Sequence, residues 1–95
     1  MFDKAKTLME LRKIQKELKS VEIEVEAGNG AVKLTINGEQ KVQNVKIDPA
    51  AVDVEDLERL ERHLESAFNQ AITKSQQEAA ERMKSVAGGL GLPGM

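Results

Sequence analysis

The chain has 95 residues and a net charge of −2, with two phenylalanines, no tryptophan, no tyrosine and no cysteine. This length fits one small domain with a limited core, and the absence of cysteine excludes disulfides and zinc–thiolate sites. A slightly negative charge argues weakly against a nucleic-acid binder, but its distribution matters more than its sum. Residues 1–20 hold six cations against three acids, whereas residues 53–72 hold two cations against six acids.

We expect a single domain over residues 1–87, followed by a flexible Gly-rich tail over residues 88–95. The sequence holds no run of about 18 apolar residues and no apolar leader, so we expect a cytoplasmic protein.

The first predicted element is an amphipathic helix over residues 2–20. Its apolar positions recur at steps of three and four, and no Gly or Pro interrupts them. Leu11, Ile14 and Leu18 form the clearest part of this stripe. We expect it to pack on another apolar surface of the same chain.

Residues 21–47 then change to alternating apolar and polar positions. Turn residues divide this stretch at 28–30 and again at 37–38. Period-two alternation between turns predicts half-buried strands, so we expect a three-stranded antiparallel meander. One face of this sheet is apolar and needs a cover, while the other is charged.

The first turn sets the predicted register of the first two strands. A two-residue loop of Gly28 and Asn29 places Val25 opposite Val32. The same loop places Ile23 opposite Leu34, and Glu24 opposite Lys33 on the charged face.

The second turn leaves two alternatives open. A two-residue loop of Asn37 and Gly38 puts Val45 and Ile47 on the apolar face, but it excludes Val42. Either a bulge at Gly38 shifts the register, or Val42 lies on the solvent side.

The second predicted helix runs from Val54 to Ala87. Asp53 is a candidate N-cap, and Gly88 and Gly89 are candidates for the C-terminal cap. A helix of this length spans roughly 50 Å, whereas a six-residue strand spans roughly 20 Å. Its second half must therefore project past the sheet, where an unsupported polar helix is marginal in water.

We therefore expect a second copy to pack along this helix in an obligate homodimer. Asn69 lies among apolar neighbours and is a candidate for a hydrogen bond across the dimer that fixes its register. The predicted dimer interface consists of Leu57, Leu60, Leu64, Phe68, Asn69, Ile72 and Met83.

The order and spacing of several short stretches resemble the YbaB/EbfC family of bacterial nucleoid-associated proteins over essentially the whole chain. They are QKEL at 15–18, AGNGAVK at 27–33, NG at 37–38, VKIDP at 45–49, AFNQA at 67–71 and MKSVAGGLGLPGM at 83–95. The resemblance implies an α+β fold with an α-β-β-β-α protomer and a tweezer-shaped homodimer. It also implies a nucleoid-associated protein that binds double-stranded DNA, organises the nucleoid and influences gene expression.

Phosphate contacts need several Lys or Arg side chains on one face. Lys13, Lys16 and Lys19 are spaced by three, and Arg12 lies one turn before Lys16. The alternative is a solvated charged face, paired to neighbouring acids. The candidate DNA-binding residues are Lys4, Lys6, Arg12, Lys13, Lys16, Lys19, Arg82 and Lys84.

Two other function classes are weighed against DNA binding. A protein-interaction adaptor or prefoldin-like chaperone dimer also has a helix–hairpin–helix order, but the first helix looks too short to form an antiparallel arm with the second. An enzyme has almost no support, since no nucleophile–base pair and no ligand cluster is present. We expect no catalytic residues, cofactor, metal, membrane partner or small-molecule substrate.

Overall fold

The structure is a computed structural model that describes residues 4–89, and it has the predicted α-β-β-β-α order. A short 3-10 turn precedes the second helix. The elements are α1 (Lys4–Ser20), β1 (Ile23–Ala27), β2 (Val32–Ile36), β3 (Val42–Ile47), η1 (Pro49–Ala51) and α2 (Leu57–Gly89). The α+β fold class is therefore confirmed.

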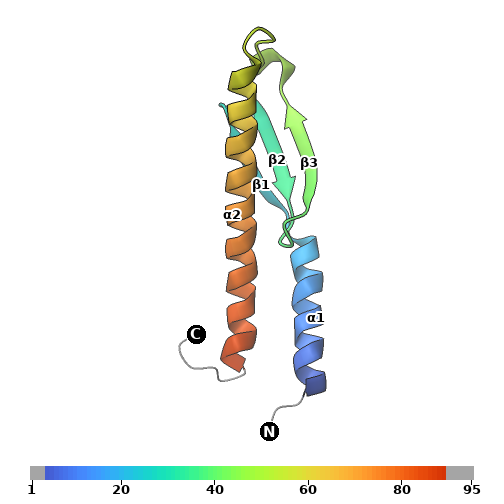
Figure 1. Cartoon of the computed structure of the whole chain (residues 1–95). Helices are drawn as coiled ribbons and strands as arrows, with labels where there is room; N and C mark the ends of the chain where they lie inside the picture. Colours follow the sequence, from blue (N-terminus) through green and yellow to red (C-terminus); the bar gives the residue numbers. More distant parts are fainter. Residues whose placement is uncertain (1–3, 90–95) are drawn as a thin grey trace.

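The molecule is elongated, with principal extents of 64 × 24 × 15 Å. The upper half of α2 crosses one face of the sheet, and its lower half continues beside α1 (Figure 1). The sheet has the order β1-β2-β3, and α2 packs against β1 and β2. The core between these layers consists of Val25, Val32, Leu34, Ile36, Ala67 and Ala71.

The predicted register of β1 and β2 is wrong by two residues. Val25 lies opposite Leu34, and Ala27 lies opposite Val32. The reason is a longer turn: Gly28, Asn29 and Gly30 all have positive φ, and the Ala31 amide bonds to the Gly28 carbonyl. The shift is even, so every apolar side chain keeps its predicted face. Ile23 lies opposite Ile36 and not opposite Leu34. Glu24 lies opposite Thr35, and Lys33 lies opposite Glu26.

The second turn resolves the alternatives for Val42. The predicted two-residue loop of Asn37 and Gly38 is wrong, because the turn extends to Lys41, whose carbonyl accepts the Asn37 amide at 2.9 Å. β3 contains a bulge that places Val42 opposite Ile36, while Val45 lies opposite Leu34. The irregularity lies between Val42 and Asn44, so a bulge exists, but inside the strand and not at Gly38. Val42, Val45 and Ile47 therefore share the apolar face of the sheet.

The projecting half of α2 is accompanied by α1, which runs antiparallel to it (Figure 1). Ile14 and Leu18 are buried there, packed with Leu11 and Ala79. The expectation that α1 packs within its own chain is thus confirmed. The inference that a second copy must support this half of α2 was wrong, because α1 already covers one side of it. The objection that α1 is too short for an antiparallel arm fails as well.

The second helix begins one turn later than predicted. The Asp53 carboxylate accepts the Glu55 amide, which closes a local turn. The Asp56 carboxylate then accepts the Arg59 amide at 3.3 Å, so Asp56 and not Asp53 lies at the N-cap of α2. The helix continues through Gly89, beyond the predicted end. The rest of the predicted tail, and residues 1–3, lie outside the described residues.

Two contacts fasten α2 to the turns at opposite ends of β2. The imidazole of His63 lies so close to Gly28 that an added Cβ would approach its Cδ2 to 2.5 Å. At the other end, the buried Ser75 hydroxyl donates to the Asn37 carbonyl at 2.8 Å and accepts the Gln40 amide at 3.0 Å.

The same Asn37 turn also holds the end of α1. The Gly38 amide donates to the Leu18 carbonyl at 2.8 Å, and both residues are buried. A Cβ built on Gly38 would lie 2.6 Å from Leu18 Cδ2 and 3.0 Å from its carbonyl oxygen. The turn is therefore the joint at which α1, the sheet and α2 meet.

Replacing Gly38 by alanine is expected to lower the free energy of unfolding by about 1–3 kcal/mol, because the joint has no room for a methyl group. Urea denaturation of the variant measures the loss. The double variant G38A/L18A should lose less free energy of unfolding than the sum of the losses in G38A and L18A, since Leu18→Ala removes the side-chain atom nearest to the added methyl group. An unchanged urea midpoint for G38A alone would show that Leu18 yields without cost.

Candidate nucleic-acid interface

Three cations of α1 lie on its surface that faces away from α2. Helical periodicity puts Arg12, Lys16 and Lys19 opposite the buried Ile14 and Leu18, and all three are exposed. Lys4, Lys6 and Lys13 are exposed as well. Within residues 4–84, none of the ion pairs formed at 4 Å or less involves Arg12, Lys13, Lys16 or Lys19. The alternative, in which these cations pair with neighbouring acids such as Glu10 or Glu17, is therefore not observed among the described residues.

Arg82 has a different environment from the cations of α1. Its Nε donates to Glu78 Oε1 and its Nη1 donates to Glu17 Oε2, each at 3.0 Å. The hydrogen bond to Glu78 raises the pKa of Arg82, and the bond to Glu17 adds to it, so the guanidinium stays charged. Arg82 thus joins α1 to α2. Lys84, the other candidate on α2, is exposed and lies 3.5 Å from Glu81.

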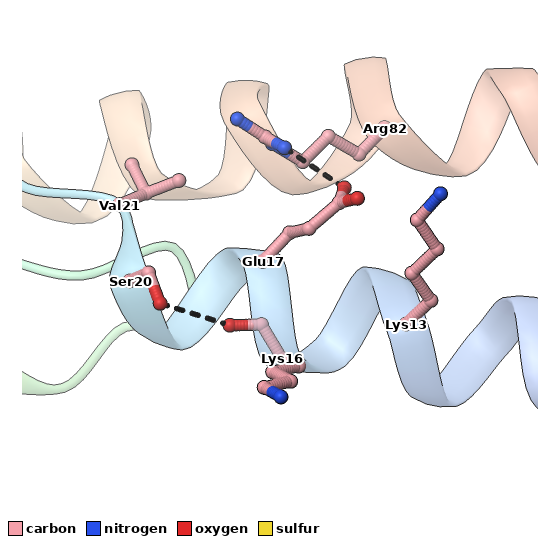
Figure 2. Close-up of a pocket in the computed structure, with 6 residues that line it drawn as sticks. All are labelled: Lys13, Lys16, Glu17, Ser20, Val21 and Arg82. Carbon is pink, nitrogen blue, oxygen red and sulfur yellow. Dashed lines mark hydrogen bonds and ion pairs between the residues drawn. The ribbon is translucent and has the colours of Figure 1, made fainter.

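An open cleft runs between the two helices beside this ion pair (Figure 2). It is lined by Lys13, Lys16, Glu17, Ser20, Val21 and Arg82. In Figure 2 the Lys13 side chain extends toward α2, whereas the Lys16 side chain points away from it. The cations predicted from the sequence therefore point in several directions and do not converge on one point. Such an arrangement suits an extended polyanion better than a small anion.

The apolar face of β3 has no cover in the protomer. Val42, Val45 and Ile47 are 38%, 40% and 43% exposed, although their neighbours on β2 are fully buried. α2 packs on β1 and β2 but does not reach β3. A single helix about 10 Å wide cannot cover three strands spaced about 4.8 Å apart. An uncovered strand could have been predicted from the alternation of residues 42–47, since the sequence predicts one long helix to cover three strands. The sequence interpretation missed this.

The predicted dimer residues of α2 fall into two groups. Leu60, Leu64 and Phe68 are half-buried and pack on the protomer's own core. Burying them therefore requires no second copy. The exposed group, in contrast, is available for a partner, and consists of Leu57, Asn69, Ile72 and Met83.

A cluster of six acidic residues lies at the other end of the molecule from the α1 cations. Asp53, Glu55 and Asp56 precede α2, and Glu58, Glu61 and Glu65 follow in its first turns. All six are exposed. Because this end of α2 lies over the sheet while α1 accompanies its far half (Figure 1), the charge separation seen in the sequence is also a separation in space. None of the helices in the described part of the chain is apolar over a length that would span a bilayer.

Comparison with known proteins agrees with this geometry. The model of the YbaB/EbfC DNA-binding family matches residues 1–90. A nucleoid-associated protein of Moorella thermoacetica is 42% identical over 85 residues, which cover 90% of this chain and 82% of that protein. A nucleoid-associated protein of Dictyoglomus thermophilum is 38% identical over 96 residues, which cover 97% and 92%.

A solved structure shares the fold. The crystal structure of an uncharacterized protein from Helicobacter pylori superposes with a TM-score of 0.68 at 22% identity, and the match covers 90% of this chain and 86% of that one. The resemblance noted in the short sequence stretches is therefore confirmed over nearly the whole chain: the protein belongs to the YbaB/EbfC DNA-binding family.

Proposed function

We propose that this protein binds double-stranded DNA as a homodimer, through the exposed cations of α1, and thereby organises the nucleoid and influences gene expression. Family membership and the names of the relatives support a nucleoid-associated DNA-binding role. The observation that carries the proposal is that Arg12, Lys13, Lys16 and Lys19 are exposed on α1 and make no ion pair with a described acid. Such side chains are available to contact phosphates.

The spacing of these cations fits a duplex. Lys13 and Lys19 are separated by about 9 Å along the helix axis at 1.5 Å per residue. A duplex presents one phosphate charge per about 1.7 Å of its axis, so such a patch meets several phosphates at once. Contacts of this kind position a protein without reading base sequence. The acidic end of the molecule repels the same polyanion, so the duplex is approached from the α1 end.

The uncovered face of β3 is the proposed dimer contact. A 95-residue chain with a small core gains stability by burying apolar surface against a second copy. The flank of α2 that carries Phe68 and Ile72 also carries Ser75, which binds the turn between β2 and β3. We expect the exposed Ile72 on this flank and the open strand to contribute to one contact. A two-fold pair that buries this surface displays the α1 patch twice.

An adaptor or prefoldin-like chaperone dimer is the second candidate. Leu8 and Met9 are 50% and 69% exposed on α1, so the antiparallel arm offers some apolar surface to a protein client. Neither residue belongs to the proposed phosphate contacts. This function predicts no dependence of duplex binding on the charges of α1.

The dependence of duplex affinity on salt tests the proposed function. If a dimer contacts at least six phosphates, affinity should fall by about three orders of magnitude between roughly 50 and 200 mM salt. Fluorescence anisotropy with a labelled duplex of arbitrary sequence measures this slope. The adaptor function predicts no duplex binding at moderate salt, and that result would reject the proposal.

A further inference from the structure

Arg82 is one of the candidate DNA-binding residues predicted from the sequence, but its ion pairs indicate a structural role. One guanidinium is held by two carboxylates, Glu78 from its own helix and Glu17 from α1. Figure 2 shows the pair with Glu17. The group of three thus carries a net charge of about −1 when all members are ionised. This net negative group repels phosphate, although it lies beside the cations of α1.

The geometry of the guanidinium points the same way. Phosphate is bound best by two parallel N–H donors of one guanidinium edge. In Arg82 both Nε and Nη1 already donate to carboxylates at 3.0 Å. Glu78 lies one turn before Arg82 on α2, so it orients the side chain toward α1. The arrangement therefore directs Arg82 to Glu17 and away from a duplex.

The ion pair with Glu17 lies beside the joint at the C-terminal end of α1. The C-terminal end of α1 is fixed by the bond from Gly38 to Leu18, and its apolar contact with α2 involves the small side chain of Ala79. Glu17 directly precedes Leu18 on α1, so its ion pair with Arg82 adds a directed contact on another side of α1, next to that joint. Partly exposed pairs such as this contribute little to global stability, but a directed hydrogen bond still restricts an angle.

We propose that Arg82 and Glu17 are positioning residues, which hold α1 at the angle to α2 that presents its cations to DNA, and that neither contacts phosphate. This inference rests on the proposed function for its DNA readout. It predicts that Glu17→Gln weakens duplex binding, even though the variant has one negative charge fewer. If the pair were only a surface contact, losing a carboxylate from a DNA-facing arm would tighten binding instead.

The test compares E17Q with a matched variant. Glu10→Gln removes the same charge from the same helix, and Glu10 makes no ion pair with the described residues. At about 0.1 M salt we expect E10Q to bind the duplex slightly more tightly than the wild type, and E17Q about five- to tenfold more weakly. The charge-swapped variant E17R/R82E retains the net charge and should recover binding to within about twofold of the wild type.

A measurement without DNA tests the arm itself. The chain has no cysteine, so cysteines placed at the exposed Gln15 and Gln76 accept spin labels at two defined sites. Dilution with unlabelled protein isolates the distance within one protomer. The distance distribution should be narrow in the wild type and E10Q, broader in E17Q and R82Q, and narrow again in E17R/R82E.

The outcomes separate the two proposals. If the wild type binds DNA and E17Q behaves like E10Q in both affinity and distance, the positioning role is refuted and the proposed function stands. If the wild type does not bind the duplex, the proposed function fails, and the role of the pair in DNA presentation fails with it. Weaker binding and a broader distance for E17Q, both reversed by the charge swap, support the positioning role.

Discussion

Replacing Lys13, Lys16 and Lys19 by glutamate is expected to weaken duplex binding by at least about 100-fold at roughly 0.1 M salt, because each reversal turns a phosphate contact into a repulsion. The three side chains are exposed and lie on α1 away from the main core, so the variant should fold normally. Anisotropy titrations give the affinity. Circular dichroism and urea denaturation check that the free energy of unfolding is retained.

The matched control reverses the same amount of charge elsewhere. Lys33, Lys41 and Lys46 are also exposed but belong to the sheet and its second turn. Their replacement by glutamate gives the same net charge, and we expect a loss of less than about tenfold, through long-range repulsion alone. The salt slope should decrease for the α1 variant and remain close to that of the wild type for the control. Equal losses in both variants would mean that net charge matters and that α1 is not the contact.

Replacing Val45 by glutamate is expected to convert the proposed dimer into monomers. Val45 lies in the middle of the uncovered apolar face of β3, where a partner would enclose it. Burying an unpaired carboxylate costs several kcal/mol, so the dimer dissociation constant should rise by at least about 1,000-fold. Sedimentation equilibrium from nanomolar to micromolar protein measures this shift. Duplex affinity should fall in parallel, because two linked patches bind more tightly than one.

The neighbouring position supplies the control for this variant. Asn44 precedes Val45 and pairs with Thr35 on the other, polar face of the sheet. Asn44→Glu therefore adds the same charge to the same strand without entering the proposed contact, and the variant should remain dimeric. A wild-type protein that sediments as a stable monomer at micromolar concentration would reject the dimer altogether. A dimeric V45E variant would move the contact to another surface.

The sequence was sufficient for the order and type of both α-helices and all three described strands, because helical and alternating patterns are clearly separated along this chain. It was insufficient for the register of the strands, which depends on the length of each turn. The stretch Gly28, Asn29, Gly30 suits both a two-residue and a four-residue loop, and only contacts made elsewhere decide between them. The bulge was anticipated from the misfit of Val42, but its place depends on pairing within the sheet, which local patterns do not contain.

The candidate site was predictable in its composition but not in its contacts. The exposure of Arg12, Lys13, Lys16 and Lys19 follows from their spacing against the Ile14 and Leu18 stripe. The pairing of Arg82 with Glu17 does not follow, because the two residues lie 65 positions apart and meet only after α1 and α2 align. The length argument for a partner along α2 failed for the same reason, since it treated the second half of α2 as if α1 were absent.

The two contacts of α2, with Gly28 and with the Asn37 turn, fix the length that β2 must have. His63 and Ser75 are about 18 Å apart at 1.5 Å per residue, which is close to the span of five or six extended residues. Deleting or inserting one residue within 32–36 would leave one turn out of reach of its fastening and would exchange the faces of the side chains beyond the change. Insertions and deletions within this family should therefore occur outside this strand, where the length of the chain is not fixed by contacts with α2.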